Sequence, residues 1–354
     1  MTHSTSLVLM ADVLETLRQK SLLVDEQLKQ LLPPAEGQAI PEVRELYSSA
    51  WDYNLRGGKR LRPALCLLSC EAFGGNPQDA LNTAAALELL QNFLLIHDDI
   101  EDASDMRRGK PCLNKLHGDA FAINSGDFVH AWMWRCLLAN KPVLGATKTF
   151  AVMREFVQQL ETTAEGQAME IAWVRDGKWD VSEEDYFELV KRKTANYTIT
   201  RPLRLGAIIA GATKRQADSL NAAGEKLGIA FQIQDDILNL APPGEAYGKE
   251  TAGDLYEGKR TLILSRALSK MKDAERGEAL ASLSKPRAQK TPEEMARVLE
   301  LVKKTGALDY CRKKARQLAS QAREQLSKKL FGLPDSQAKS DIFALVDFIV
   351  EREY

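Results

Sequence analysis

A short acidic segment of the sequence has the residue types of a metal site. Positions 98–102 (DDIED) follow the largely apolar run 87–96 and place four carboxylates within five residues. On a helix, Asp98 and Asp102 share one face, about 6 Å apart along the axis. Two such carboxylates repel each other unless a cation lies between them, and oxygen ligands on a rigid face suit Mg2+. Taken alone, the segment also fits an acidic helix end dissolved in water.

A second pair of aspartates in the same kind of setting favours the metal site. Asp235 and Asp236 follow another apolar helical face, 227–234. Facing helices of a bundle commonly supply metal ligands from both sides of a cavity. We therefore expect the two acidic helix ends to face each other across a cavity.

Basic residues accompany both acidic pairs. Arginine forks and lysine ammonium groups are the usual ligands of phosphate oxygens, although the same cations can form surface ion pairs worth only ~0–1 kcal/mol each. The basic clusters are 57–63 (GGKRLRP), 107–111 (RRGKP), Lys193-Thr194, Lys249 and Lys259-Arg260. Together with the acidic pairs they predict a pocket for two diphosphate groups.

Helical periodicity runs through most of the chain, and strand signals are nearly absent. Short turns rich in Gly, Pro or Asn separate the periodic segments, and the polar stretch 272–290 resembles a surface excursion between helices. The expected helices are 9–32, 40–55, 60–73, 78–102, 115–138, 143–173, 183–211, 214–240, 259–271, 292–304, 306–329 and 336–353. We predict one all-α domain, 1–354, of ten or more helices.

Composition excludes several broad classes of protein. The 354 residues are 44% hydrophobic and 27% charged, and 48 basic residues balance 49 acidic ones, which gives no global argument for nucleic acid or an anionic membrane. No stretch approaches the ~18 apolar residues of a membrane span, and the N-terminus does not resemble a signal peptide. The five cysteines lack a regular spacing and are expected to be reduced, as in a soluble cytoplasmic protein.

The motifs, in their order and spacing, resemble a known family. The matching segments are 57–63 (GGKRLRP), the Asp-Asp-x-x-Asp motif at 98–102 with 107–109 (RRG), 122–127 (AINSGD), 193–195 (KTA), 231–236 (FQIQDD), 257–261 (EGKRT) and 333–336 (LPDS). From about residue 40 to the end, the chain is similar to the trans-isoprenyl diphosphate synthases, or polyprenyl synthetases. It most resembles the geranylgeranyl diphosphate synthases.

The resemblance implies a fold and a reaction. The fold would be a single polyprenyl synthetase domain, an all-α bundle around a central cavity that assembles as a homodimer. The reaction would condense an allylic diphosphate (dimethylallyl, geranyl or farnesyl) head to tail with isopentenyl diphosphate, with Mg2+ as cofactor. Ionisation of the allylic carbon–oxygen bond is the hard step, and cations stabilise the departing pyrophosphate. That pyrophosphate would itself take the proton, so no histidine is required, and His97 would only orient its neighbours.

Each implied role falls on particular residues of this sequence. The residues implied in catalysis are Asp98, Asp99, Asp102, Lys193, Thr194, Gln232, Asp235 and Asp236. Of these, Asp98, Asp102 and Asp235 would bind Mg2+, and Asp99 and Asp236 would be outer or additional ligands. The residues implied for the allylic diphosphate are Arg107, Lys193, Thr194, Gln232, Lys249 and Lys259. Those implied for isopentenyl diphosphate are Lys59, Arg62, Gln91 and Arg108.

Two features of the motifs bear on activity and product. Asn239 stands where many members of the family have a third aspartate, which removes one charge from the second motif. Phe93 and Leu94, five and four residues before Asp98, would line the growing prenyl tail, and only Phe93 is aromatic. That pattern resembles archaeal-type geranylgeranyl synthases, so we expect a C20 product. Farnesyl (C15) and longer products (C25 or more) remain as alternatives, as does a deeper pocket floor that would set the length.

Two other activities compete with this interpretation. A class I terpene cyclase would share the fold and the first motif, but it would have no use for an isopentenyl diphosphate site at Lys59 and Arg62. A catalytically silent partner subunit would commonly have lost one acidic motif, whereas this chain retains both pairs.

Overall fold

The fold is helical throughout, as predicted. A computed structural model describes residues 3–240, 252–330 and 332–351 of the chain, in which two strands of two residues each are the sole β-structure. No helix in these ranges combines the length and the apolar content that a membrane crossing requires. The chain forms two compact units. A single domain spanning both units stays a prediction.

Unit 1 comprises Met1–Gln158, Thr198–Asn221 and Leu326–Phe348. Its elements are α1 (His3–Leu31), α2 (Pro41–Leu55), α3 (Leu61–Ala72), the 3-10 helix η1 (Pro77–Ala80), α4 (Leu81–Glu101), β1 (Met106–Arg107), β2 (Lys110–Pro111), α5 (Leu113–His117), α6 (Asp119–Leu138), the first part of α7 (Lys141–Arg175), α9 (Arg201–Ala210), α10 (Lys214–Asp218) and most of α17 (Gln337–Glu351). The two strands form one antiparallel hairpin directly after α4.

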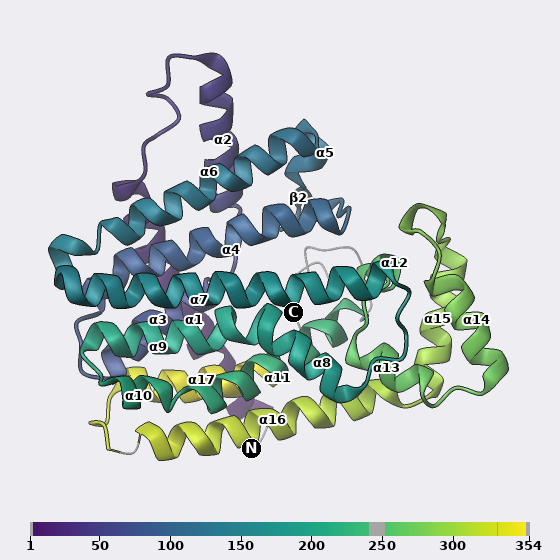
Figure 1. The fold of residues 1–354 in the computed structure, drawn as a ribbon. Coiled ribbons are helices and arrows are strands. Elements are labelled where there is room, and N and C mark those ends of the chain that lie inside the picture. The colour runs from purple at the N-terminus through teal and green to yellow at the C-terminus, as the bar shows by residue number, and fades with distance from the viewer. Residues whose placement is uncertain (1–2, 241–251, 331, 352–354) are drawn as a thin grey trace. The chain divides into compact units, whose positions relative to one another are not determined.

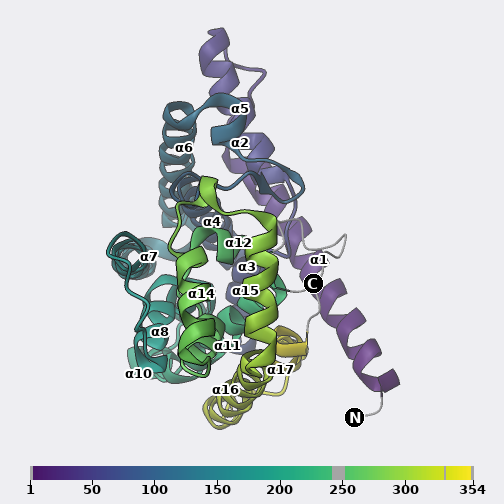
Figure 2. The ribbon, with the colours of Figure 1, turned by 90° about the vertical axis from the view of Figure 1, so that its right-hand side faces the viewer.

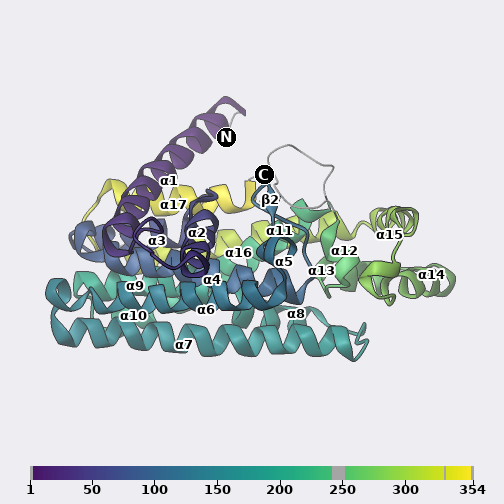
Figure 3. The ribbon, with the colours of Figure 1, turned by 90° about the horizontal axis from the view of Figure 1, so that it is seen from above.

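Helix α4 is central to unit 1. It packs along α6, and α3 packs against both α4 and α9 (Figures 1 and 3). From Leu81 to Asn92 every residue of α4 is buried, because helices cover it on several sides. The small residues of α9 permit a close approach to α3. A Cβ on Gly206 would lie 2.2 Å from the carbonyl oxygen of Cys66.

Unit 2 comprises Gln159–Tyr197, Ala222–Gln325 and Ile349–Tyr354. Its elements are the second part of α7, α8 (Glu183–Val190), most of the π-helix η2 (Lys191–Thr200), α11 (Asn221–Asn239), α12 (Gly253–Glu257), α13 (Leu262–Leu268), α14 (Asp273–Leu283), the 3-10 helix η3 (Arg287–Gln289), α15 (Pro292–Lys304) and most of α16 (Ala307–Leu330). Helices α14 and α15 lie side by side (Figure 2).

Several helix assignments from the sequence were wrong. One is 214–240, which is divided into α10 and α11, and two further cases follow. The polar stretch 272–290 contains the helix α14, because Ala279 and Leu283 give it an apolar face that is buried. The segment 183–211 is not one α-helix, since the π-helix η2 separates α8 from α9. Ser182 and Thr291 each form a capping box at the start of α8 and α15.

The contact at Gly206 gives a test of the α3–α9 packing. Gly206→Ala should lower the free energy of unfolding by about 1–3 kcal/mol, because the added methyl group meets backbone atoms that cannot move aside. Gly277→Ala, within α14, is the matched control. No atom lies within 4 Å of its added Cβ, so it should stabilise by about 0.5–1 kcal/mol. Urea unfolding followed by circular dichroism measures both, and equal shifts would contradict the packing.

Candidate active site

The first acidic motif occupies the end of α4 in unit 1. The helical turn continues one residue past Glu101, since the backbone N–H of Asp102 donates to the carbonyl oxygen of Asp98 over 2.8 Å. Asp98 and Asp102 are partly exposed, whereas Asp99 between them is buried. The two exposed carboxylates therefore leave one helical face a single turn apart, as their spacing predicts.

Asp99 is bound by its own protein neighbours. It accepts hydrogen bonds from the Tyr53 hydroxyl at 2.9 Å and from Arg107 Nε at 2.7 Å. Burial and the charge of Asp99 raise the pKa of Tyr53 well above its usual value, so this phenol remains a donor. Arg107 NH2 also lies 3.8 Å from Oδ2 of Asp98. Asp99 thus fixes α2, the hairpin and the end of α4 to one another, while Asp98 stays partly accessible.

The three basic residues of the segment 57–63 differ in burial. Arg60 is buried, whereas Lys59 and Arg62 are partly exposed. Arg60 is only 3% exposed and is bound within the protein, so it belongs to the packing rather than to an anion site. It donates to Glu88, to Asp25 at 3.0 Å and to the carbonyl oxygen of Asn54 at 2.5 Å. Its charge is satisfied by carboxylates of two helices, α1 and α4.

Three other basic residues of unit 1 that the sequence singled out, Lys59, Arg62 and Arg108, remain partly accessible. Lys59 Nζ lies 5.2 Å from the ring centroid of Phe348, and Arg62 donates to the hydroxyl of Thr198 at 2.7 Å. Arg108 NH2 lies 3.4 Å from Glu88, but its NH1 is buried without a hydrogen-bond partner. A buried guanidinium nitrogen without an acceptor is costly, and a phosphate oxygen would satisfy it.

The second acidic motif has the same design within unit 2. Asp236 is 4% exposed and accepts hydrogen bonds from the Tyr186 hydroxyl at 2.7 Å and from Gln232 Nε2 at 2.8 Å. Thr194 donates to the amide oxygen of Gln232 at 3.0 Å. Three residues that the resemblance implied, from two helices, therefore form one hydrogen-bonded chain. Asp235 beside them is partly exposed.

A close approach of two helices brings this chain together. A Cβ on Gly228 of α11 would lie 2.4 Å from Ala195 of η2, so glycine is required there. Gln232 stands one turn after Gly228, and Thr194 immediately precedes Ala195. The rare π-helical winding of η2, which often marks functional sites, carries Lys193 and Thr194 to this contact. No residue pattern in the segment 191–200 indicates that winding.

A third carboxylate joins the second motif, and sequence reasoning missed it. Burial, the charge of Asp254 and the charge of Asp235 raise the pKa of Asp236 well above its usual value. Asn239 holds this arrangement, since its amide oxygen accepts from the backbone N–H of Asp254 at 3.1 Å. One feature of the sequence could have pointed to Asp254. It stands three residues before the matching segment 257–261. Crowded carboxylates of this kind favour a bound cation.

The predicted cations of unit 2 are paired with carboxylates. Lys193 contacts Glu170, and Lys259 Nζ lies 2.7 Å from Glu257 and 3.9 Å from Asp254. Glu170 had not been singled out from the sequence, whereas Glu257 is the first residue of the matching segment 257–261. Lys249 lies outside the described residues. These ion pairs keep the lysine side chains in place, and an incoming diphosphate would have to compete with the carboxylates.

The donor chemistry fits Mg2+ better than a softer metal. Both motifs offer carboxylate oxygens on helices, whereas thiolate and imidazole would be expected for zinc or copper. Over the described ranges, no group of three or more His, Cys, Asp or Glu side chains is arranged to hold an ion by itself. A Mg2+ ion bound by one or two carboxylates would complete its shell with water and substrate phosphate.

Comparison with known proteins agrees with this chemistry. The polyprenyl synthetase family model matches residues 44–302. A short chain isoprenyl diphosphate synthase of Methanothermobacter thermautotrophicus is 33% identical, covering 98% of this chain and 100% of the relative. A geranylgeranyl diphosphate synthase of Methanosarcina mazei is also 33% identical, over 98% of this chain and 100% of the relative.

Solved structures are similar over nearly the whole chain. A geranylgeranyl pyrophosphate synthetase from Pyrococcus horikoshii has a TM-score of 0.83 at 32% identity and covers 97% of this chain and 99% of its own. A geranylgeranyl pyrophosphate synthase from Corynebacterium glutamicum, solved with isoprenyl diphosphate and magnesium, has a TM-score of 0.81 at 28% identity, over 97% of this chain and 98% of its own. The chain therefore belongs to the polyprenyl synthetase family of trans-prenyltransferases.

Proposed function

We propose that this protein is a Mg2+-dependent prenyltransferase that condenses an allylic diphosphate head to tail with isopentenyl diphosphate, with geranylgeranyl diphosphate (C20) as its product. The observation that carries the proposal is the shared design of the two acidic motifs. In each motif a buried aspartate is held by a tyrosine hydroxyl, and a neighbouring aspartate remains partly exposed. That design presents carboxylate oxygens to a cation on a fixed support.

The bond changes assign a task to each group of residues. The allylic carbon–oxygen bond breaks, pyrophosphate leaves with the electron pair, isopentenyl diphosphate attacks the allylic carbon, and its proton passes to the pyrophosphate. Mg2+, when bound to Asp98, Asp102 and Asp235, would neutralise the charge that develops on the departing oxygens. That the two motifs face each other across one cavity stays a prediction.

Side chains of each unit would hold one part of the substrates. Gln232 would donate to the allylic diphosphate through the second hydrogen of its amide nitrogen, and the Thr194 hydroxyl would turn from Gln232 to the diphosphate. Lys193 and Lys259 would add positive charge. Arg107, held by Asp99, would contribute from the first motif. For isopentenyl diphosphate, the unpaired NH1 of Arg108 would act with the side chains that the resemblance implied, which are Lys59, Arg62 and Gln91.

The relatives support C20 and leave one specific alternative. Among similar proteins, those of Methanosarcina mazei and Sulfolobus acidocaldarius are named geranylgeranyl diphosphate synthases, at 33% and 35% identity. One from Aeropyrum pernix, 35% identical over 84% of this chain and 91% of its own length, is named a geranylfarnesyl diphosphate synthase. A C25 product is therefore the second candidate. Incubation with dimethylallyl, geranyl and farnesyl diphosphate in turn, with sizing of the products, decides between them. A chain that forms no product from any starter would refute the function.

The family match extends over both units. Residues 44–302, to which the family model corresponds, include most of unit 1 and unit 2, which supports one functional domain for the whole chain. All five cysteines are free and buried, which agrees with the proposed cytoplasmic location, where thiols stay reduced.

A homodimer is also part of the proposal. Large apolar side chains of α6 and α7 are exposed on unit 1, including Leu138 at 62% and Phe150 at 65%. Exposed apolar surface of this extent marks interaction sites, and a second copy would bury the same residues from both sides.

Removal of one exposed aspartate from either motif should nearly abolish turnover. Asp98→Ala and Asp235→Ala should each lower kcat by about 100-fold or more, because the charge on the departing pyrophosphate loses part of its stabilisation. Incorporation of radiolabelled isopentenyl diphosphate measures the loss, and circular dichroism checks helicity. Asp105→Ala and Asp273→Ala, exposed acids on the same two units, are the controls. Near-normal activity of either motif variant would count against the metal site.

The side chain of Phe93 should limit product length. Phe93→Ala should lengthen the main product by one or more five-carbon units, because the loss of the ring opens several methylenes of depth beside the tail. Chromatography of the dephosphorylated alcohols measures the change. Phe128→Ala, which removes a ring from α6 that packs on Tyr47 and Trp132, is the control. An unchanged chain length would exclude Phe93 as a determinant.

Disruption of the apolar face should dissociate the dimer. Phe150→Asp should change the molar mass in solution from twice the chain mass to the chain mass, because the charge would be buried unpaired at the interface. Light scattering after gel filtration reports this mass. The same substitution at an exposed polar position, Lys303→Asp on α15, should leave the mass unchanged. A wild type that elutes as a monomer would refute the proposed assembly.

A further inference from the structure

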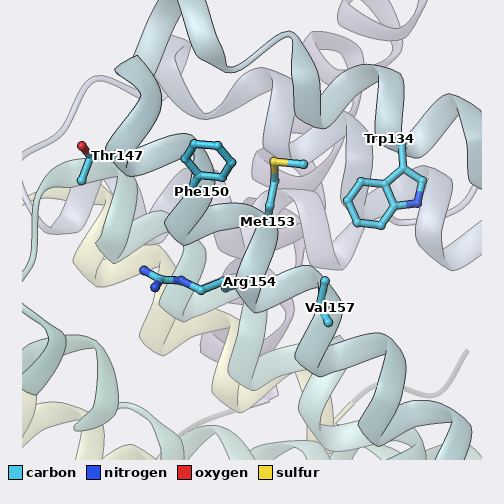
Figure 4. Close-up of a pocket in the computed structure, with 6 residues that line it drawn as sticks. All are labelled: Trp134, Thr147, Phe150, Met153, Arg154 and Val157. Carbon is cyan, nitrogen blue, oxygen red and sulfur yellow. The ribbon is translucent and has the colours of Figure 1, made fainter.

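Unit 1 has an apolar groove outside the candidate active site. Trp134 of α6 lines it together with Phe150, Met153 and Val157 of α7 (Figure 4). Phe150 also belongs to the exposed apolar face that the proposed homodimer would bury. We therefore assign the groove to that interface rather than to a separate ligand.

A buried lysine of unit 2 has a different environment. Lys290 follows η3 at the end of the polar stretch 272–290, yet it is only 7% exposed. Its Nζ donates to the carbonyl oxygen of Leu255 at 2.9 Å and to that of Tyr256 at 2.8 Å. Both carbonyls belong to the last turn of α12. An ammonium group at this end of a helix can hydrogen-bond the terminal carbonyls and is favoured by the helix dipole.

The protein keeps this lysine in a place that disfavours its charge. Burial lowers the pKa of Lys290 to about 8, and the charges of Arg260 and Arg287 act in the same direction, while Glu257 opposes them. A well-packed apolar side chain of similar size would avoid that cost. Packing alone therefore does not explain the lysine, whereas an apolar side chain could not supply its two hydrogen bonds to α12.

The other end of α12 is held by the second acidic motif. The side-chain amide oxygen of Asn239 accepts from the backbone N–H of Asp254 at 3.1 Å, and its carbonyl oxygen accepts from the backbone N–H of Ala252 at 2.7 Å. The backbone N–H of Lys259, just after α12, donates to the carbonyl oxygen of Asp254 at 3.0 Å. Asn239 and Lys290 therefore hold opposite ends of a short helix that contains Asp254 and leads into Lys259.

Arg260 supports the turn that follows α12. Its guanidinium donates to the carbonyl oxygen of Gly258 and to that of Lys178 at 2.7 Å, and it lies 3.9 Å from a ring centroid of Trp179. Arg260 is thus bound within the protein, and Lys259 is the residue of this pair that remains as a candidate ligand of the diphosphate.

These contacts give Lys290 a task in the proposed reaction. We propose that Lys290 is a positioning residue, which places Asp254 and Lys259 for the allylic diphosphate and Mg2+ through two hydrogen bonds to the end of α12. The inference rests on the proposed prenyltransferase function. Lys290 would act through the backbone of α12 and would not itself contact substrate. Its loss should affect the allylic diphosphate and Mg2+ but not isopentenyl diphosphate, whose implied ligands belong to unit 1.

Removal of the donor tests this role. Lys290→Met keeps an unbranched side chain but has no N–H groups, so the KM for the allylic diphosphate and the Mg2+ concentration for half-maximal activity should each rise about 10-fold. The KM for isopentenyl diphosphate should stay close to that of the wild type. Lys290→Arg retains N–H donors for both carbonyls and should recover most of the lost affinity. Lys285→Met, which removes an ammonium group that contacts Glu294 from the same polar stretch, is the matched control and should leave all three values unchanged.

Hydrogen exchange followed by mass spectrometry reports on α12 without catalysis. In Lys290→Met the backbone amides of 252–261 should exchange faster than in the wild type, whereas those of α4 should not change. Circular dichroism checks that each variant is folded. Lys290→Leu, which is smaller and also lacks a donor, replaces Lys290→Met in both measurements if the methionine variant does not fold.

The outcomes distinguish the inference from the function on which it rests. Equal rises in KM for both substrates would indicate general loosening and would overturn the positioning role, as would a Lys290→Arg enzyme as weak as Lys290→Met. An unchanged KM for the allylic diphosphate in Lys290→Met would overturn it and leave the prenyltransferase intact. A wild type that consumes no isopentenyl diphosphate with Mg2+ and any of the three starters would refute the function. Unchanged exchange of 252–261 in Lys290→Met would separately refute the support of α12.

Discussion

The placement of carboxylates out of water is the constraint on which this structure depends. Asp99 and Asp236 are almost fully buried, and each accepts a hydrogen bond from a tyrosine that is itself buried. An uncompensated buried charge costs several kcal/mol, so these tyrosines are needed for the aspartates to persist inside the protein. Each buried aspartate fixes the turn that carries an exposed neighbour. The exposed carboxylates then keep their positions although they repel one another.

The ion pairs that the basic residues form with glutamates follow from the same constraint. Lys193 and Lys259 contact Glu170 and Glu257, and Arg108 shares Glu88 with Arg60. Cations that are held in this way lose little conformational entropy when a diphosphate arrives, although they must exchange one anionic partner for another. The buried NH1 of Arg108 is an exception, since it has no acceptor to give up.

Much of the fold and part of the site could be predicted from the sequence. Helical periodicity located α2 and α15, and Asp98 and Asp102 share a helical face as their spacing requires. Local patterns could not separate Arg60 from Lys59 and Arg62, because the left-handed backbone of Arg60 (φ 47°) directs its side chain inward to Glu88. The place of Asp254 beside Asp236 and the π-helical winding of η2 depend on tertiary contacts that no local pattern encodes.

Metal stoichiometry tests the central claim most directly. Mg2+ is titrated by calorimetry into the protein saturated with an unreactive thiolo-analogue of an allylic diphosphate. The wild type should bind Mg2+ only together with the analogue, and Asp98→Asn and Asp235→Asn should each bind fewer ions than the wild type while remaining folded. Mg2+ binding by both variants that equals that of the wild type, or no binding by the wild type, would contradict the account.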